Sequence, residues 1–218
     1  DPLQWSFSNV SQSGPVTASQ ALVSEGGNPG DVWEHRWSIP SAGGSSSYRV
    51  ANINRTFTYD LGLYGPLSSL SYSFDAIGIA TSGFSSPFYG YFLPTLRQNG
   101  QVYFTSGTFL SPTAAWSTFS ATITGSTVWV DPNNQANGIH PDFSASAGLI
   151  EFGYIFSTGT SQCPTAACAA ASVTSRLDNF SVSAYAVPVP EPSTFVLTAA
   201  GLAGLAASQR RRRMAAMR

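Results

Sequence analysis

The chain has 218 residues, of which 10% are charged, against about 25% in an average globular protein. It contains no lysine, and residues 1–209 hold five arginines against eleven acidic residues, which gives them a net charge of −6. A body this acidic lacks the basic surface that nucleic acids require, so nucleic acids are excluded as partners.

Residues 1–187 suffice for one domain with a well-buried core, and residues 188–218 differ from them in composition. We therefore divide the chain into a body and a tail at this point. The chain begins at Asp1 and not at methionine, from which we expect either that a signal peptide was removed or that the sequence is a fragment.

Apolar and polar residues alternate at a period of two through the body, and no helical pattern of useful length interrupts them. In the first predicted strand, Leu3, Trp5 and Phe7 share one face. The glycine-rich residues 26–30 predict a turn before the third strand. The first five predicted strands cover residues 3–7, 16–23, 31–39, 48–59 and 70–74.

The dipeptide Asn99-Gly100 separates two strand-like runs, residues 88–98 and 101–109. It predicts a hairpin with a type I′ turn, because that turn needs positive φ at both central positions. Pro94 within the first run cannot donate a hydrogen bond to a neighbouring strand, so we expect an edge strand or a bulge there.

A second hairpin is predicted around Gly125-Ser126, and residues 149–156 and 177–187 supply the last two strands. With ten or eleven short strands separated by turns, the sequence predicts an all-β fold, either a β-sandwich or a jelly roll.

The tail has three zones in a fixed order. Residues 188–192 are rich in proline, which prevents a helix there. The apolar run 195–207 follows within an uncharged stretch of 193–209, which as a helix spans roughly 25 Å of a hydrocarbon core of about 30 Å. Arg210 to Arg213 then resist translocation and stay on the cytoplasmic side. We predict a short C-terminal transmembrane helix, in preference to an amphipathic or buried one.

These tail residues resemble the PEP-CTERM sorting signal. The matching sorting residues are Pro190, Glu191, Pro192, Arg210, Arg211, Arg212 and Arg213. The resemblance implies export across the inner membrane of a Gram-negative bacterium and recognition by an exosortase-type membrane protease. It also implies that the protein is anchored through the tail or released to the cell surface and the exopolysaccharide matrix.

Export bears on the two cysteines, Cys163 and Cys168, which lie in one predicted loop. Outside the cytoplasm two neighbouring cysteines usually oxidise, so we predict a disulfide between them. A metal site at these two residues would need further cysteine or histidine ligands nearby.

The body has a second resemblance, to laminin-type and carbohydrate-binding jelly-roll modules. It is carried by residues 26–30, 70–75, 149–154 and 177–182. In some of these modules an acidic residue at the start of the last strand helps to hold a structural calcium, which implies that role for Asp178. Because Asp178, Phe180 and Val182 alternate, we expect them to share a face, so that a buried Asp178 carboxylate needs calcium or backbone N–H donors.

An Asn-rich stretch, residues 131–135 with Asp142 further on, weakly resembles a calcium loop. We interpret it as an ordinary turn, because Ala136 stands where an EF-hand loop needs glycine.

Candidates for catalysis are few. The chain has two histidines, His35 between tryptophans and His140 before a proline. We interpret the first as a packed or partly exposed residue and the second as a capping or turn residue. Glu34 and Glu151 could meet across a sheet and act as acid and base, which is the enzyme alternative. We predict that the protein is not an enzyme.

A glycan-binding surface requires exposed aromatic faces beside hydrogen-bonding groups. In the run 84–92, Phe88 and Phe92 fall on one face and Tyr89 and Tyr91 on the other, and either pair could form the platform. We take Tyr89 and Tyr91 as the candidate platform. The leading interpretation is thus an exported surface or matrix protein with a non-catalytic body and no cofactor beyond a structural calcium. The alternatives are a carbohydrate-binding module, a structural matrix subunit that self-associates through an uncovered edge strand, and a glycan-active enzyme.

Overall fold

The computed structural model describes residues 2–40, 46–84, 86–132, 139–160, 170–188 and 198–203. It divides the chain into two compact units, Asp1–Ala186 and Val187–Arg218. The two cysteines and the sorting residues of the tail lie outside the described residues.

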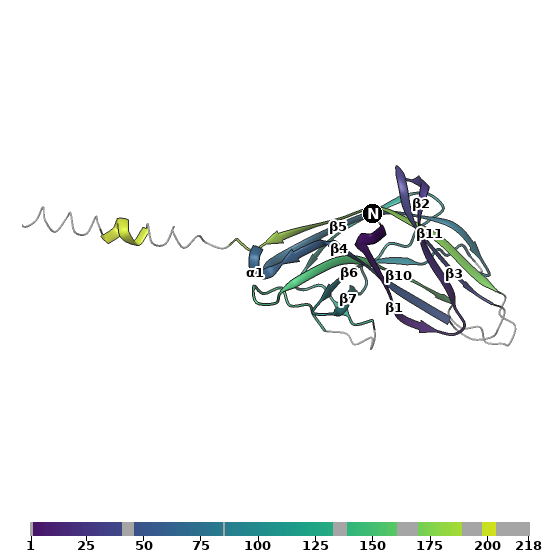
Figure 1. Ribbon diagram of the computed structural model, residues 1–218, viewed down its shortest axis with the longest axis horizontal. Helices are drawn as coiled ribbons and strands as arrows, with labels where there is room; N and C mark the ends of the chain where they lie inside the picture. The colour runs from purple at the N-terminus through teal and green to yellow at the C-terminus, as the bar shows by residue number, and fades with distance from the viewer. Residues whose placement is uncertain are drawn as a thin grey trace, which may run out of the picture. The chain divides into compact units, whose positions relative to one another are not determined.

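The described part of the first unit is almost entirely β-structure (Figure 1). In chain order its elements are η1 (Pro2–Gln4), β1 (Trp5–Ser13), β2 (Thr17–Gly27), β3 (Gly30–Ile39), β4 (Ser46–Asp60), α1 (Leu61–Tyr64), β5 (Leu67–Ser82), β6 (Tyr91–Gln98), β7 (Gln101–Thr105), β8 (Ser117–Thr124), β9 (Trp129–Val130), β10 (Leu149–Thr160) and β11 (Ala171–Ala186).

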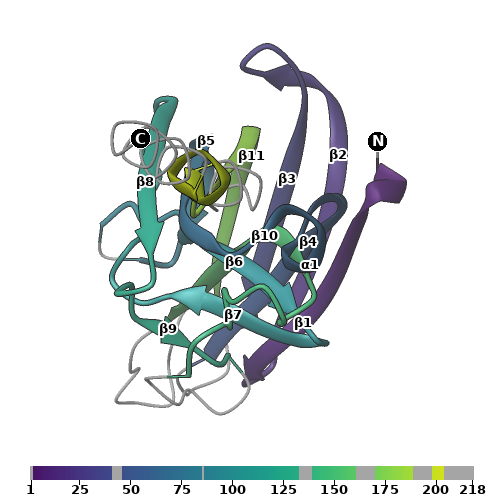
Figure 2. The same ribbon diagram turned by 90° about the vertical axis from the view of Figure 1, so that its left-hand side faces the viewer.

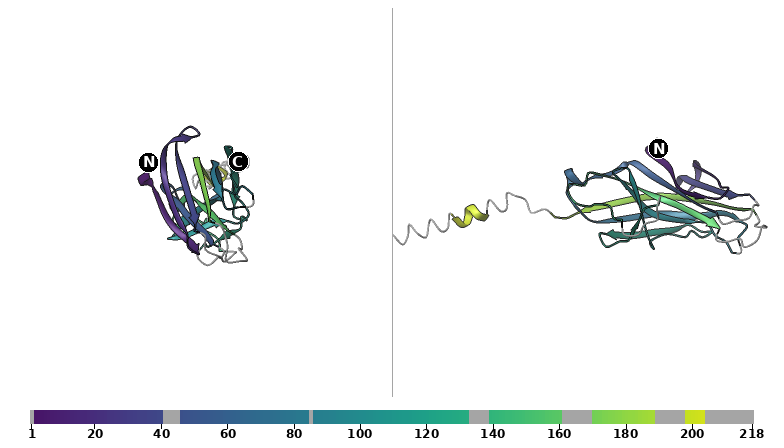
Figure 3. Two further views of the ribbon diagram at one scale, coloured as in Figure 1. Left: turned by 90° about the vertical axis from the view of Figure 1, so that its right-hand side faces the viewer. Right: turned by 90° about the horizontal axis from the view of Figure 1, so that it is seen from below.

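The strands form two antiparallel sheets, which confirms the predicted β-sandwich. One sheet has the order β1-β4-β10-β6-β7-β9 and the other the order β2-β3-β11-β5-β8. In Figure 2 the second sheet runs from β8 at one side of the molecule to β2 at the other, and Figure 3 gives the view from the opposite side. The last two strands of the chain are not edge strands: β10 pairs with β4 and β6, and β11 pairs with β3 and β5.

The predicted hairpin at Asn99-Gly100 is confirmed, with φ values of 51° and 80° at its two turn residues. The expectation for Pro94 is wrong, because β6 is an inner strand that pairs with β10 on one side and β7 on the other. The ladder with β7 begins only at Thr95, so the missing N–H of Pro94 falls just outside that ladder.

Aromatic side chains fill the space between the sheets. Trp37, Phe74, Phe92 and Phe156 are each at most 1% exposed and come from β3, β5, β6 and β10. Two buried hydrogen bonds also cross between the sheets. His35 Nε2 and the hydroxyl of Tyr154 are 3.0 Å apart, and the hydroxyl of Tyr72 donates to the carbonyl of Thr95 at 2.9 Å.

In the second unit, residues 198–203 are helical. Among the residues that the structure describes, no helix is long and apolar enough to cross a membrane. The predicted membrane segment, residues 195–207, lies mostly outside those residues.

Candidate functional site

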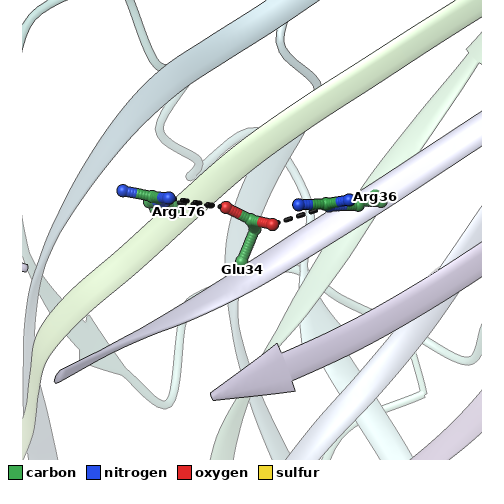
Figure 4. Close-up of polar contacts among 3 residues, drawn as sticks. All are labelled: Glu34, Arg36 and Arg176. Carbon is green, nitrogen blue, oxygen red and sulfur yellow. Dashed lines mark hydrogen bonds and ion pairs between the residues drawn. The ribbon is translucent and has the colours of Figure 1, made fainter. Parts of the chain in front are cut away.

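The enzyme alternative paired Glu34 with Glu151 across a sheet as acid and base, but the two residues lie in different sheets. Glu34 belongs to β3 of one sheet and Glu151 to β10 of the other, and arginines neutralise both. Figure 4 shows Glu34, which is 4% exposed, between Arg36 and Arg176 at 2.6 and 2.8 Å. Burial raises the pKa of Glu34, but the hydrogen bonds and charges of the two arginines outweigh burial, so the net pKa is lowered.

The interpretation of His35 as a packed residue is confirmed. Its side chain is 1% exposed, and its ring stacks on Phe156 at 4.9 Å between ring centroids. Burial lowers the pKa of His35 from 6.5 to about 3, so the imidazole is neutral in the folded protein. His140 is exposed and lies outside every strand.

Tyr89 and Tyr91 do not form a joint platform in the structure. The ring of Tyr89 packs on Gly78 of β5, where an added Cβ would come within 2.1 Å of the tyrosine Cγ. The ring of Tyr91 instead makes edge contacts with Phe88 at 5.1 Å and Phe109 at 4.9 Å. Since Phe109 is 48% exposed, Tyr91 and Phe109 remain a candidate aromatic surface.

Asp178 does not share a face with Phe180, which corrects the sequence prediction. The register of β11 against β5 shifts between Asp178 and Ser181, where Asn179 has a φ of 51°. This bulge turns Leu177 and Phe180 inward and leaves Asp178 on the outer face. The two Asp178 carboxylate oxygens accept the backbone N–H groups of Asn28 and Asn179 at 2.5 and 2.7 Å.

Asp75 of β5, the register partner of Asp178, belongs to the same network. Its carboxylate accepts hydrogen bonds from Thr118 and from the side-chain amides of Asn28 and Asn179. Burial raises the pKa of Asp75, and these three hydrogen bonds outweigh burial and lower it overall. The network ties the turn between β2 and β3 to the bulge in β11.

In the described part of the chain, no group of three or more His, Cys, Asp or Glu side chains lies close enough together to hold a metal ion. Asp142, which follows the Asn-rich stretch 131–135, accepts the N–H of Ser144 at 2.8 Å. That hydrogen bond lowers the pKa of Asp142. Residues 133–135 of the predicted turn lie outside the described residues.

A cleft of about 360 Å³ lies between the two sheets, and we call it the lateral cleft. Its lining comes from β4, β10 and β11 and holds no charged side chain. The lining residues are Thr56, Phe57, Thr58, Phe152, Phe180, Ser181, Val182 and Ala184.

The lateral cleft opens because two neighbouring strands end early. The pairing of β1 with β4 stops at Asn54, and the pairing of β3 with β11 stops at Leu177. Beyond these points β4 and β11 are sheet edges on the same side of the sandwich. Between Ile53 and Thr58 the β4 register against β10 also shifts, which makes β4 bulge outward.

The bulge in β4 is held by one side chain. Asn54 Oδ1 accepts hydrogen bonds from the N–H and the hydroxyl of Thr56 at 2.8 Å each, and from the N–H of Phe57 at 3.2 Å. This positions Phe57, which is 38% exposed, with its ring stacked on Phe180 at 5.9 Å and 11°. The result is an aromatic wall beside the hydroxyls of Thr56, Thr58 and Ser181.

Sequence reasoning missed the lateral cleft. Phe180 was correctly assigned to an apolar face, but nothing local shows that the strands beside residues 55–58 and 180–184 have ended. The only local signal is the Asn54-Arg55-Thr56 triplet, in which an asparagine can bond to the backbone two residues on.

Comparison with protein families shows that residues 188–213 match the PEP-CTERM protein-sorting motif. The resemblance of the tail is therefore confirmed. No protein with curated annotation matches the chain.

Three similar solved structures are carbohydrate-binding modules. One, described as "CBM4 structure and function", is 14% identical over 76% of this chain and 78% of its own, with a TM-score of 0.33. The N-terminal cellulose-binding domain of Cellulomonas fimi β-1,4-glucanase C is 13% identical over 80% and 91%, with a TM-score of 0.32. A CBM27 module described for specific mannan recognition is 11% identical over 82% and 89%, with a TM-score of 0.30.

The depressed pKa of His35 predicts a pH-dependent stability. Between pH 6.5 and about 3, His35 binds a proton in the unfolded chain but not in the folded protein. The neutral, buried His35 therefore contributes fully to the free energy of unfolding above pH 6.5, and this contribution is lost as the pH falls. We expect the free energy of unfolding to decrease by up to about 1.4 kcal/mol per pH unit between pH 6 and 5. Urea unfolding at several pH values measures this slope.

In the same experiment His35→Gln should flatten the slope, whereas His140→Gln should leave it unchanged because His140 is exposed. An unchanged slope in His35→Gln would show that another group titrates.

Proposed function

We propose that the protein is an exported surface protein, sorted through its tail and processed by an exosortase-type membrane protease, with a non-catalytic β-sandwich as its body. The observation that carries this proposal is the PEP-CTERM motif over residues 188–213, directly after the compact unit that ends at Ala186. A non-catalytic body is supported by the neutralised Glu34 and Glu151 and the buried His35.

The finer parts of this proposal follow from the sequence. We propose that residues 195–207 form the membrane segment, that Cys163 and Cys168 are oxidised after export, and that the protein acts in the exopolysaccharide matrix of a Gram-negative cell. Thiol labelling without reductant should find no free cysteine in the exported protein. Two labelled thiols would contradict oxidation.

The sorting proposal predicts a change of mass. In the producing bacterium the surface-exposed protein should be lighter than the full chain, because the protease removes the tail. Glu191→Ala should leave the full mass, since it alters the centre of the Pro-Glu-Pro signal, and so should loss of the protease gene. Intact-mass spectrometry of the purified protein checks this.

Glu25→Ala is the matched control, because Glu25 is an exposed glutamate of β2 outside the tail. It should be processed like the parent. Equal masses with and without the protease would refute processing.

For the body we propose glycan binding in the lateral cleft as a second function. An uncharged cleft with an aromatic wall and flanking hydroxyls suits a ligand that has both apolar faces and many hydroxyl groups. Neutral sugars have this chemistry. The body's net negative charge also favours a neutral over an acidic polysaccharide.

The lateral cleft predicts that Phe57→Ala weakens binding to neutral oligosaccharides by about tenfold, because the exposed aromatic wall is lost. Phe109→Ala is the matched control, since Phe109 is also exposed but lies against Tyr91, outside the cleft. Calorimetric titration of a panel of neutral oligosaccharides provides the affinities. If only Phe109→Ala weakens binding, the site is the aromatic surface at Tyr91. If no neutral glycan binds, the glycan proposal is wrong.

For Asp178 we propose that backbone N–H donors, and not calcium, satisfy the carboxylate. The support is that both of its oxygens already accept an N–H group. A chelator should then leave the melting temperature of the parent unchanged, while Asp178→Asn should lower it with or without chelator. A parent that loses several degrees on chelation, with an Asp178→Asn variant that does not respond, would establish a calcium site.

A further inference from the structure

Besides the parts of β4 and β11 that are uncovered at the lateral cleft, the described sheets end in four edge strands, β1, β9, β2 and β8. Natural edge strands usually carry a device against pairing with another chain, such as a bulge, a charge or a very short length. Three of these edges have one. The register of β1 shifts at Val10, β9 has two residues, and β2 carries Glu25 within a register shift.

The fourth edge, β8, has none of these devices. Ser117–Thr124 contains no charge and no proline, and it pairs with β5 along its whole length without a register shift. Within the described chain nothing lies beyond β8 in its sheet. In Figure 2 it borders one side of the sandwich.

The backbone groups of β8 alternate in direction. Thr124 donates its N–H to the Thr127 hydroxyl and its carbonyl accepts the Thr127 N–H, both at 3.0 Å, so its backbone does not bond to β5. Because direction alternates along an antiparallel strand, Thr118, Ser120 and Thr122 also point their N–H and C=O groups away from β5. These three residues form a row of available donors and acceptors.

The side chains of β8 divide between two faces. Phe119 and Ile123 are 8% and 0% exposed and lie in the core, with Ala121 packed against it. Thr118, Ser120 and Thr122 are exposed on the outer face. The β8 edge therefore has apolar side chains on its inner face and hydroxyl-bearing side chains on its outer face, and neither face carries a charge.

We propose that β8 pairs with β8 of a second copy of this chain, antiparallel and with the two-fold axis at Ser120. In this register Ser120 faces Ser120 of the partner, and Thr118 faces Thr122, so all three outward-pointing residues exchange backbone hydrogen bonds. The inner face matches the large Phe119 with the small Ala121 of the partner. The outer face matches hydroxyl with hydroxyl, and no like charges meet. The two five-stranded sheets then form one continuous sheet.

Sedimentation velocity of the full chain in a mild detergent tests the dimer. The parent should show a reversible monomer–dimer equilibrium. Ser120→Lys with Thr122→Lys should abolish it, because the lysine introduced at position 120 faces its own copy in the partner, and the lysine introduced at position 122 lies diagonally across from that copy on the same outer face. Thr17→Lys with Ser19→Lys, at exposed positions of the edge strand β2, is the matched control and should still dimerise. A monomeric parent at tens of micromolar, or a β8 variant that still associates, would overturn the proposal.

Cysteine cross-linking tests the register. Ser120→Cys should form a disulfide-linked dimer under mild oxidation, since facing residues of a bonded pair have Cα atoms about 5.5 Å apart. Thr118→Cys should not, because the two copies of residue 118 are displaced by roughly 13 Å along the strands. The parent chain under the same oxidation controls for Cys163 and Cys168. Equal cross-linking of both variants would exclude this register.

Discussion

The order in which the strands occur along the chain is the constraint on which the structure depends. β10 and β11, the last two strands, occupy inner positions and join β4 to β6 and β3 to β5. β10 also supplies Tyr154 to the hydrogen bond with His35 and Phe156 to the stack on the His35 ring. Neither sheet is complete until the last strands have inserted, so the core closes only through contacts between distant parts of the chain, which are slow to form. An exported chain with this topology completes its fold only after nearly all of the body has been translocated.

The features that could be predicted from the sequence are those that depend on interactions between residues close together in the chain. Period-two alternation and the Asn99-Gly100 turn are local, and they gave the β-sandwich and the hairpin. Pro94 was misplaced because its strand gains β10 as a neighbour from more than fifty residues away, which no local pattern reveals. Asp178 was placed on the wrong face because the left-handed Asn179 inserts a bulge into an otherwise regular alternation.

The candidate site was hidden for the same physical reason. The lateral cleft exists where β1 and β3 stop and leave β4 and β11 uncovered, and the lengths of paired strands are a tertiary property. The charged residues first considered for chemistry have structural partners instead. Glu34 binds Arg36 and Arg176, and Glu151 binds Arg97, so a chain with few charges uses many of them to stabilise its own sheets.

The two proposed surfaces lie on opposite sides of the sandwich. The lateral cleft borders β11 on the side of β3, whereas β8 lies beyond β5 at the other end of the same sheet. A dimer formed through β8 therefore leaves both clefts open and presents two of them in one rigid particle. Two weak sites on one particle bind a repeating polymer more tightly than either alone, because the second contact forms at a high effective concentration. Pairing through β8 would thus convert a modest affinity for each sugar segment into firm attachment to a polysaccharide. The double β8 variant should then lose retention on the polymer while keeping its affinity for a short oligosaccharide.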